Sequence, residues 1–126
     1  MLTRSGMALI LVVDDEAVVV MLARIALERA GHRVETASSG ADAYAVAAKL
    51  EHLDVLIVNH RIPPDRGRDI AERLLRTHPG MKVMHISGWL RQHLEEEDSL
   101  TPGAVFLSKP FTISQMQAAV AELLPA

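Results

Sequence analysis

Five short segments typical of strands recur along the chain, separated by longer stretches in which apolar residues return at helical spacing. The segments at 8–13 and 54–59 contain uninterrupted apolar residues, which is typical of strands buried on both faces. The segment at 33–36 has one apolar side, which suits a sheet edge, and the other two segments cover 82–86 and 104–107. Each intervening stretch is long enough for a crossover helix, so the pattern predicts parallel pairing. We expect an α/β fold: a doubly wound five-stranded parallel sheet with helices on both faces.

The intervening stretches predict five helices, at 16–30, 39–50, 67–77, 89–97 and 112–124. In the first helix the apolar positions at helical spacing predict the buried face, and these positions are Val18, Leu22, Ile25 and Ala26. Gly31 then occupies the position where glycine typically ends a helix.

Two of the predicted helices begin with recognisable caps. Ser39 followed by Asp42 predicts an N-cap with an acidic residue in the first turn. Thr112 followed three residues later by Gln115 predicts a capping box at the start of the last helix. These signals fix where the second and the last helix start.

Composition limits the function classes. The 126 residues suggest one domain over 1–126, with 1–7 as a flexible N-terminal tail. The net charge of −3, with acids and bases mixed, argues against a nucleic-acid partner. The absence of cysteine excludes disulfides and thiolate chemistry. No signal peptide is visible and the run at 8–13 is too short to span a bilayer, so we expect a cytoplasmic domain without a membrane partner.

Polar residues stand where four of the predicted strands end. Asp14 and Asp15 follow the first strand, and the third, fourth and fifth strands lead to Asn59, Ser87 and Lys109. Any one of them alone is explained by a helix cap or a turn. In a parallel sheet, however, all four strand ends lie at one edge, which is where open α/β sheets bind ligands. Together they indicate a functional site.

The segments around these ends, at 10–16, 59–63, 86–88 and 106–111, together resemble the receiver domain of two-component response regulators, the CheY-like family. The resemblance covers essentially the whole chain, in matching order and spacing. It implies the flavodoxin-like strand order 2-1-3-4-5 and a role in signal transduction rather than an enzymatic activity.

The resemblance also implies roles for residues in the acidic pocket. Asn59 stands where the family has the aspartate that accepts a phosphoryl group from a kinase histidine. Asp14 and Asp15 resemble the acidic pair that holds Mg²⁺, and the backbone carbonyl of Arg61 would complete a metal site together with position 59. These four residues are the implied metal ligands.

Three further residues resemble the family's switch. Ser87 resembles the hydroxyl residue that moves toward the phosphoryl group, Phe106 the aromatic residue whose rotamer follows it, and Lys109 the cation that pairs with the phosphoryl group. The resemblance further implies a cis bond between Lys109 and Pro110.

Asn59 is a departure with chemical consequences. A carboxylate attacks phosphorus and forms an acyl phosphate, whereas a neutral amide is a poor nucleophile without an equivalent stable product. Losing one negative ligand also weakens Mg²⁺ binding, because this hard cation favours carboxylate and phosphate oxygens. We therefore predict an atypical receiver, not phosphorylated at the usual site, in which the Asn59 amide donates a hydrogen bond to Asp14 or Asp15 and fixes one state.

Alternatives remain open. Deamidation of Asn59 would restore an aspartate, although the following His60 should hinder it, and Asp65 or Asp15 would be substitute acceptors in a conventional phosphoaccepting regulator. A phosphatase of the haloacid-dehalogenase type also begins with an aspartate after the first strand. Its two further motif positions hold Glu16 and Val18 here, so that match fails.

The expected partners follow from the resemblance. They are a sensor histidine kinase or another signalling protein, with homodimerisation through the face of the fourth helix, fifth strand and fifth helix. The stretch at 100–107 resembles receivers fused to hybrid sensor kinases. A stand-alone protein and a part of a longer one both remain open.

Overall fold

The computed structural model describes residues 7–125. The flexible tail predicted at 1–7 therefore lies, apart from Met7, outside the described residues. Seven strands and five helices lie within the described range. They are β1 Leu9–Val13, α1 Ala17–Arg29, β2 Arg33–Ala37, α2 Gly40–Ala48, β3 Val55–Asn59, β4 Arg61–Ile62, β5 Asp65–Arg66, α3 Gly67–Thr77, β6 Lys82–Ser87, α4 Arg91–Glu96, β7 Val105–Ser108 and α5 Ile113–Leu123.

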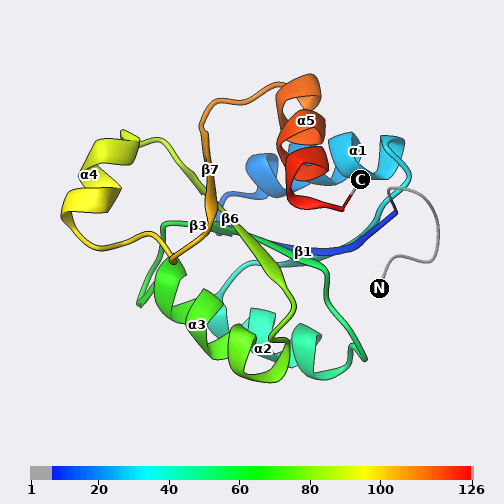
Figure 1. The fold of residues 1–126 in the computed structure, drawn as a ribbon, viewed down its shortest axis with the longest axis horizontal. Helices are drawn as coiled ribbons and strands as arrows, with labels where there is room; N and C mark the ends of the chain where they lie inside the picture. Colours follow the sequence, from blue (N-terminus) through cyan, green and yellow to red (C-terminus); the bar gives the residue numbers. More distant parts are fainter. Residues whose placement is uncertain (1–6, 126) are drawn as a thin grey trace.

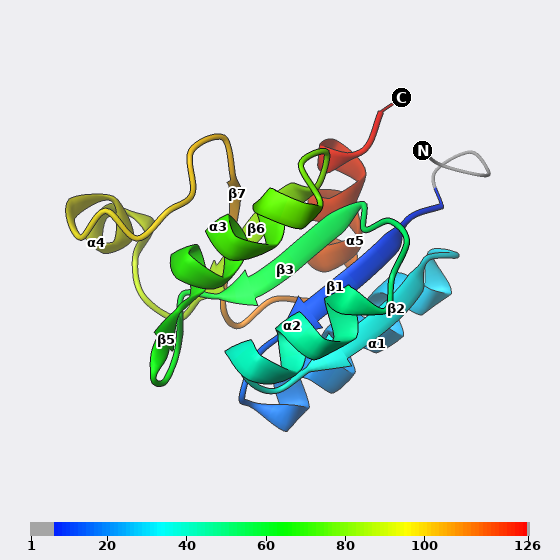
Figure 2. The same cartoon turned by 90° about the horizontal axis from the view of Figure 1, so that it is seen from below.

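Five of the strands form one parallel sheet in the order β2-β1-β3-β6-β7. This confirms the predicted doubly wound sheet, and in the numbering of the five expected strands the order is 2-1-3-4-5. The central strands β1 and β3 are buried along their whole length, as the uninterrupted apolar runs indicated. Figure 2 shows β1 and β3 side by side and pointing the same way.

Helices cover both faces of the sheet (Figure 1): α1 and α5 lie on one face, α2 and α3 on the other. Alternate residues of each strand enter the two cores. On β1, Ile10 and Val12 pack in the core under α1 and α5, whereas Leu11 packs in the core under α2 and α3. Burial of these two apolar layers is the main force that stabilises the domain.

The buried face of α1 differs from the prediction. Ala23, Ala26 and Leu27 are the buried residues of this helix, so Ala26 lies inside as expected. Val18 is 71% exposed and Ile25 37% exposed, so their assignment to the buried face was wrong. The helix carries apolar residues on several sides, and the side that faces the core holds Ala23, Ala26 and Leu27, with Val19 and Val20 partly buried beside them.

Two local features were not predicted. Residues 61–66 form a short antiparallel hairpin, β4–β5, around Pro63 and Pro64, and its Ile62 side chain is buried. The helix expected at 89–97 is reduced to α4, which buries only Leu94 and projects away from the sheet (Figure 1). The chain after α4 returns over β6 instead.

The predicted caps are confirmed. The Ser39 hydroxyl accepts a hydrogen bond from the Asp42 backbone N–H, and Thr112 and Gln115 form the reciprocal capping box. The Lys109–Pro110 bond is cis, as the resemblance implied, and Pro63–Pro64 is a second cis bond. Among residues 7–125, no helix is both long and apolar enough to cross a membrane.

Candidate functional site

The sheet order brings the strand ends with polar residues together. β1, β3, β6 and β7 are adjacent, and their carboxyl ends lie on the side of the molecule that carries the β4–β5 hairpin and α4 (Figure 2). Backbone hydrogen bonds join the segments beyond the strands: His60 N–H donates to the Ile86 carbonyl at 3.1 Å, and Lys109 N–H donates to the Ser87 carbonyl at 2.8 Å. The site is therefore anchored by the sheet itself.

Lys109 is held by two carboxylates. Its Nζ lies 2.7 Å from Asp14 Oδ2 and 2.8 Å from Glu16 Oε1. The Asp14 side chain is fully buried, and its other oxygen accepts a hydrogen bond from the Glu16 backbone N–H at 3.0 Å. Sequence reasoning placed Asp14 and Lys109 at one edge but did not find Glu16 as a partner of the lysine.

Burial and charge oppose each other in this ion pair. Burial raises the pKa of Asp14, and the contacts with Lys109 and the Glu16 backbone lower it only in part, so the pKa stays above its ordinary value. Burial alone would lower the pKa of Lys109, but its contacts with Asp14 and Glu16 outweigh that effect and the pKa is raised. The lysine is thus cationic and engaged within the chain at neutral pH.

Asn59, at the end of β3, is buried and uses its amide locally. Its Nδ2 donates a hydrogen bond to the Arg61 backbone carbonyl at 2.9 Å. The prediction of a bond from this amide to Asp14 or Asp15 was wrong, because the tight turn into β4 brings the Arg61 carbonyl closer to it. Asn59 Oδ1 is buried and has no hydrogen-bond partner within residues 7–125.

Ser87 is held by two groups that sequence reasoning missed. Its hydroxyl lies 2.8 Å from His60 Nδ1 and accepts a hydrogen bond from the Trp89 backbone N–H, also at 2.8 Å. The His60 and Trp89 rings are in contact, with their centroids 4.9 Å apart. Burial, together with the cations Arg61 and Lys109, lowers the pKa of His60. The imidazole beside Ser87 is therefore neutral at neutral pH.

Asp15 and Phe106 are the remaining predicted site residues. Asp15 is exposed and, with Asp14, lines a hollow of about 400 Å³ between α1 and the loop before α2. Asn59, Ser87 and Lys109 are not among the residues that line this hollow. Phe106 is half-buried on the edge strand β7, paired in register with His85.

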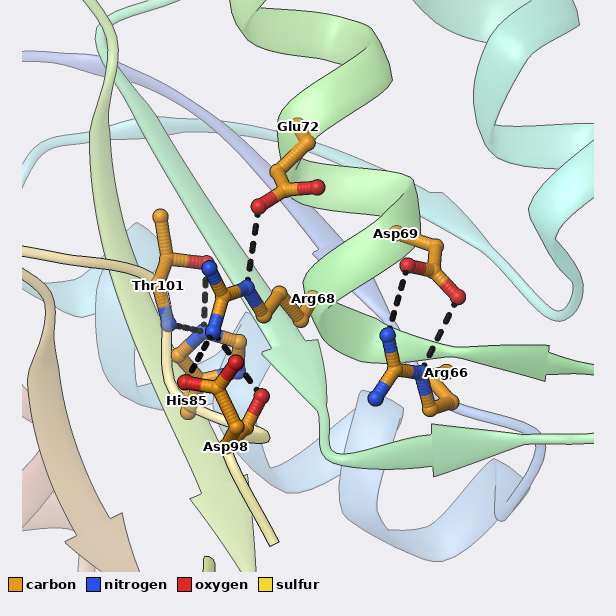
Figure 3. Close-up of polar contacts among 7 residues, drawn as sticks. All are labelled: Arg66, Arg68, Asp69, Glu72, His85, Asp98 and Thr101. Carbon is orange, nitrogen blue, oxygen red and sulfur yellow. Dashed lines mark hydrogen bonds and ion pairs between the residues drawn. The ribbon is translucent and has the colours of Figure 1, made fainter. Parts of the chain in front are cut away.

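A second polar cluster lies beside the site on the α3 face of the sheet (Figure 3). His85 is fully buried; its Nε2 accepts a hydrogen bond from the Thr101 backbone N–H at 3.1 Å and lies 2.9 Å from the Thr101 hydroxyl. Arg68 of α3 donates to the Asp98 carboxylate at 2.6 Å and to Glu72 at 2.9 Å. These contacts hold the segment after α4 over β6.

Figure 3 also shows a bidentate pair at the start of α3, where Arg66 donates to both carboxylate oxygens of Asp69 at 3.1 Å. This pair is exposed and lies on the hairpin side, so it stabilises the helix entry rather than the site.

The oxygen ligands that the family implies for Mg²⁺ fit such an ion only in part. Asp15, Asp14 and the unpartnered Asn59 Oδ1 are oxygen donors of the kind this hard cation prefers. However, Asp14 is paired with Lys109, and the Arg61 carbonyl already accepts the Asn59 amide. Across residues 7–125, no group of three or more His, Cys, Asp or Glu side chains is arranged to hold a metal ion.

Comparison with known proteins identifies the family to which the chain belongs. The family model of the response regulator receiver domain matches residues 10–121. The chain belongs to this family. The response regulator receiver protein CpdR of Brucella abortus (strain 2308) is 30% identical to this receiver over 101 residues, which are 80% of this chain and 83% of CpdR.

A much longer sensor kinase and a solved chemotaxis response regulator are also similar to this receiver. The sensor kinase CckA of Brucella abortus (strain 2308) is 31% identical over 121 residues, which are 95% of this chain but only 13% of CckA. The structure of the chemotaxis response regulator CheY4 of Vibrio cholerae matches with a TM-score of 0.82 at 26% identity, covering 94% of this chain and 100% of CheY4. The similarity therefore covers the whole of CheY4 but only a small part of CckA.

Proposed function

We propose that this receiver transmits a signal by protein–protein contact, without forming an acyl phosphate at the usual position. The observation that carries the proposal is Asn59, which ends β3 at the position that resembles the phosphoacceptor. An amide has no lone pair comparable in nucleophilicity to a carboxylate, and its nitrogen here already donates to the Arg61 carbonyl. Phosphoryl transfer depends on positioning and charge neutralisation, but it still needs a nucleophile.

The internal contacts of Lys109 and Ser87 support the proposal. The family resemblance implies that these two side chains respond to a phosphoryl group. Here, however, the lysine contacts Asp14 and Glu16, and the Ser87 hydroxyl contacts His60. An incoming anion would have to replace contacts that already satisfy these groups. We infer that the domain rests in one arrangement and is switched, if at all, by a partner.

Mg²⁺ binding in this receiver is proposed to be weak. Asp14, Asp15 and Asn59 Oδ1 would hold the ion, which would supply charge neutralisation. Asp14 would first have to leave Lys109, and the site has one negative ligand fewer than a site with an aspartate at position 59.

The proposed partners are a sensor histidine kinase or another signalling protein, and the similarity to part of the sensor kinase CckA supports this choice. Homodimerisation through α4, β7 and α5 stays a prediction. The half-buried apolar residues of β7 favour it, while the shortness of α4 removes part of that surface.

Intact-protein mass after incubation with acetyl phosphate and Mg²⁺ tests the proposal. We expect no phosphoryl adduct on the unaltered protein and an adduct of one phosphoryl group on Asn59→Asp, because the substitution restores the carboxylate at the end of β3. An Asn59→Ala variant is the matched control, since it removes both the amide and any deamidation.

The alternatives give different results in the same experiment. An adduct on the unaltered protein that is lost in Asn59→Ala would identify a deamidated Asn59 as acceptor. An adduct that persists in Asn59→Ala would point to another carboxylate, Asp15 or Asp65. Either result would contradict phosphate-independent signalling, and an unmodified Asn59→Asp variant would contradict the assignment of position 59.

A further inference from the structure

One side of helix α1 is apolar and open to solvent. Val18 is 71% exposed, Met21 56% and Ile25 37%. These residues follow one another at intervals of three and four positions, so they are neighbours along one side of the helix, which we call the α1 stripe. Of the five large apolar side chains that are exposed within residues 7–125, three therefore lie together on α1.

Charges of opposite sign stand at the two ends of the α1 stripe. Arg29 is the last residue of α1 and follows Ile25 by four positions, so it continues the stripe. Asp15 lies three positions before Val18, at the amino-terminal end of the helix. Both charged residues are exposed, and neither forms an ion pair within residues 7–125. The stripe thus has an acidic end and a basic end, both open to a partner.

This pattern is complementary to itself when two helices run antiparallel. Val18 and Ile25 lie at equal distances from the midpoint between residues 21 and 22, and Asp15 and Arg29 lie symmetrically about residue 22. A two-fold axis at the centre of the stripe therefore places Val18 opposite Ile25 of a second copy. The same axis places Asp15 opposite Arg29 of that copy, at both ends of the helix pair. An interface about a two-fold axis uses the same patch on both subunits, as this pattern requires.

We propose that two copies of this receiver associate through antiparallel packing of their α1 stripes. Burial of the exposed apolar side chains supplies the attraction, and the two pairs of Asp15 with Arg29 set the orientation and the register. A parallel arrangement would instead place like charges together. The second copy is the occupant because the stripe itself supplies both halves of a matching interface.

The α1 stripe adjoins the candidate site and is separate from the face of α4, β7 and α5. Met21 and Asp15 line the hollow of about 400 Å³ that is also lined by the buried Asp14. Arg29 of a second copy, paired with Asp15, would place a cation at the rim of this hollow. Association through α1 requires no particular residue at position 59, so it goes beyond the proposed function and does not depend on it.

Analytical ultracentrifugation of the unaltered protein over a wide concentration range measures the association. The stripe is small, so we expect a weak monomer–dimer equilibrium rather than a permanent dimer. Val18→Asp places a carboxylate opposite Ile25 and should weaken the association about 10-fold. Ala45→Asp is the matched control at an exposed position of α2 and should leave it unchanged.

An exchange of charges tests the antiparallel orientation. Arg29→Glu and Asp15→Lys each place like charges together in a dimer of identical copies, so each variant alone should associate about 10-fold more weakly. A mixture of the two variants restores opposite charges at both ends, so a heterodimer should form as readily as the unaltered dimer. Added salt should reduce the difference between the mixture and the single variants.

Introduced cysteines identify the face that lies at the axis, since the chain has none of its own. Met21→Cys places a thiol close to its counterpart in the second copy and should give a disulfide-linked dimer on air oxidation. Gln92→Cys, at an exposed position of α4, is the control and should stay monomeric under the same conditions. A disulfide that forms faster at position 92 would assign the interface to the α4 side and overturn the inference.

Three further results would overturn it: a monomer at every concentration, equal association by Val18→Asp, or a mixture of charge variants that associates no better than its components. Met21→Gln replaces Val18→Asp if that variant does not fold. All of these results leave the acyl-phosphate experiment untouched. Conversely, phosphorylation of the unaltered protein would contradict the proposed function while the α1 dimer persisted, so the two failures are distinguishable.

Discussion

Stability between about pH 7.5 and pH 5 should depend on His85. This imidazole is completely buried on β6, and its Nε2 accepts a hydrogen bond from the Thr101 backbone N–H. A proton on Nε2 would abolish that acceptor. Burial, helped by the positive charge of Arg68 and by His60, lowers the pKa of His85 from 6.5 to about 4.

The direction and size of the change in stability follow from the difference between the pKa of His85 in the unfolded and in the folded chain. Above 6.5 the ring is neutral in both the folded and the unfolded chain, so folding stability is unaffected. As the pH falls below 6.5 the unfolded chain binds a proton that the folded chain excludes until about pH 4. At ~1.4 kcal/mol per pH unit, the free energy of unfolding should fall by ~2 kcal/mol down to about pH 5 and by ~3 kcal/mol in all.

Urea unfolding of the unaltered protein and of His85→Gln, each at about pH 7.5 and pH 5, measures this loss. The glutamine oxygen reaches the position of Nε2 and accepts from Thr101 without titrating. We expect the unaltered protein to lose ~2 kcal/mol more than the variant. His32 and His60, whose pKa values are also lowered by burial, contribute equally to both proteins and cancel. Equal losses in the two proteins would refute the reasoning.

Two further substitutions test the site and its support. Lys109→Met leaves the buried Asp14 carboxylate without its cation, so urea unfolding at neutral pH should show a loss of roughly 3 kcal/mol, and unchanged stability would contradict the ion pair. Gly67→Ala places a methyl group against the Asn59 backbone carbonyl, which cannot move without disturbing β3, and should cost about 1–3 kcal/mol in the same assay. Gly80→Ala, where the space is open, is its control, and an equal effect of both would contradict the clash.

The sheet could be predicted from the sequence because its central strands leave no ambiguity. Every residue of β1 and β3 is buried and, except for the terminal Asn59, apolar, and only a sheet covered on both faces accommodates that pattern. The capping box of Thr112 and Gln115 likewise fixes a helix start through local hydrogen bonds alone. Where a signal is local or unbroken, tertiary contacts do not reverse it.

The buried side of α1 could not be predicted, because the helix offers several apolar sides. Val18 would suit a core as well as Ala23 does, but it lies on a different side of the helix from the buried Ala23, Ala26 and Leu27. The β4–β5 hairpin was missed because each strand has two residues, too few for any periodicity. Pro63 and Pro64 signalled the turn but not the ladder around it.

The candidate site was predicted as a location rather than as a set of contacts. Parallel strands bring Asp14, Asn59, Ser87 and Lys109 to one edge whatever their side chains do. Which atoms meet depends on turns a few residues long, so the bond from the Asn59 amide was assigned to the wrong acceptor. His60 was named only as a neighbour of Asn59, although a histidine directly after a strand end was the available signal for a partner of Ser87.

The contacts around position 59 also indicate which route a signal would take. Lys109 is reached only by breaking two ion pairs, one of them with a fully buried carboxylate, and that is costly. Ser87 instead has two contacts without an ion pair, one with His60 and one with the backbone N–H of Trp89, a residue that is 44% exposed. Because the cost of rearranging a contact rises with its burial and charge, the Trp89 side offers the lower barrier. A receiver with an amide at position 59 would thus be switched more easily from its surface than from its pocket.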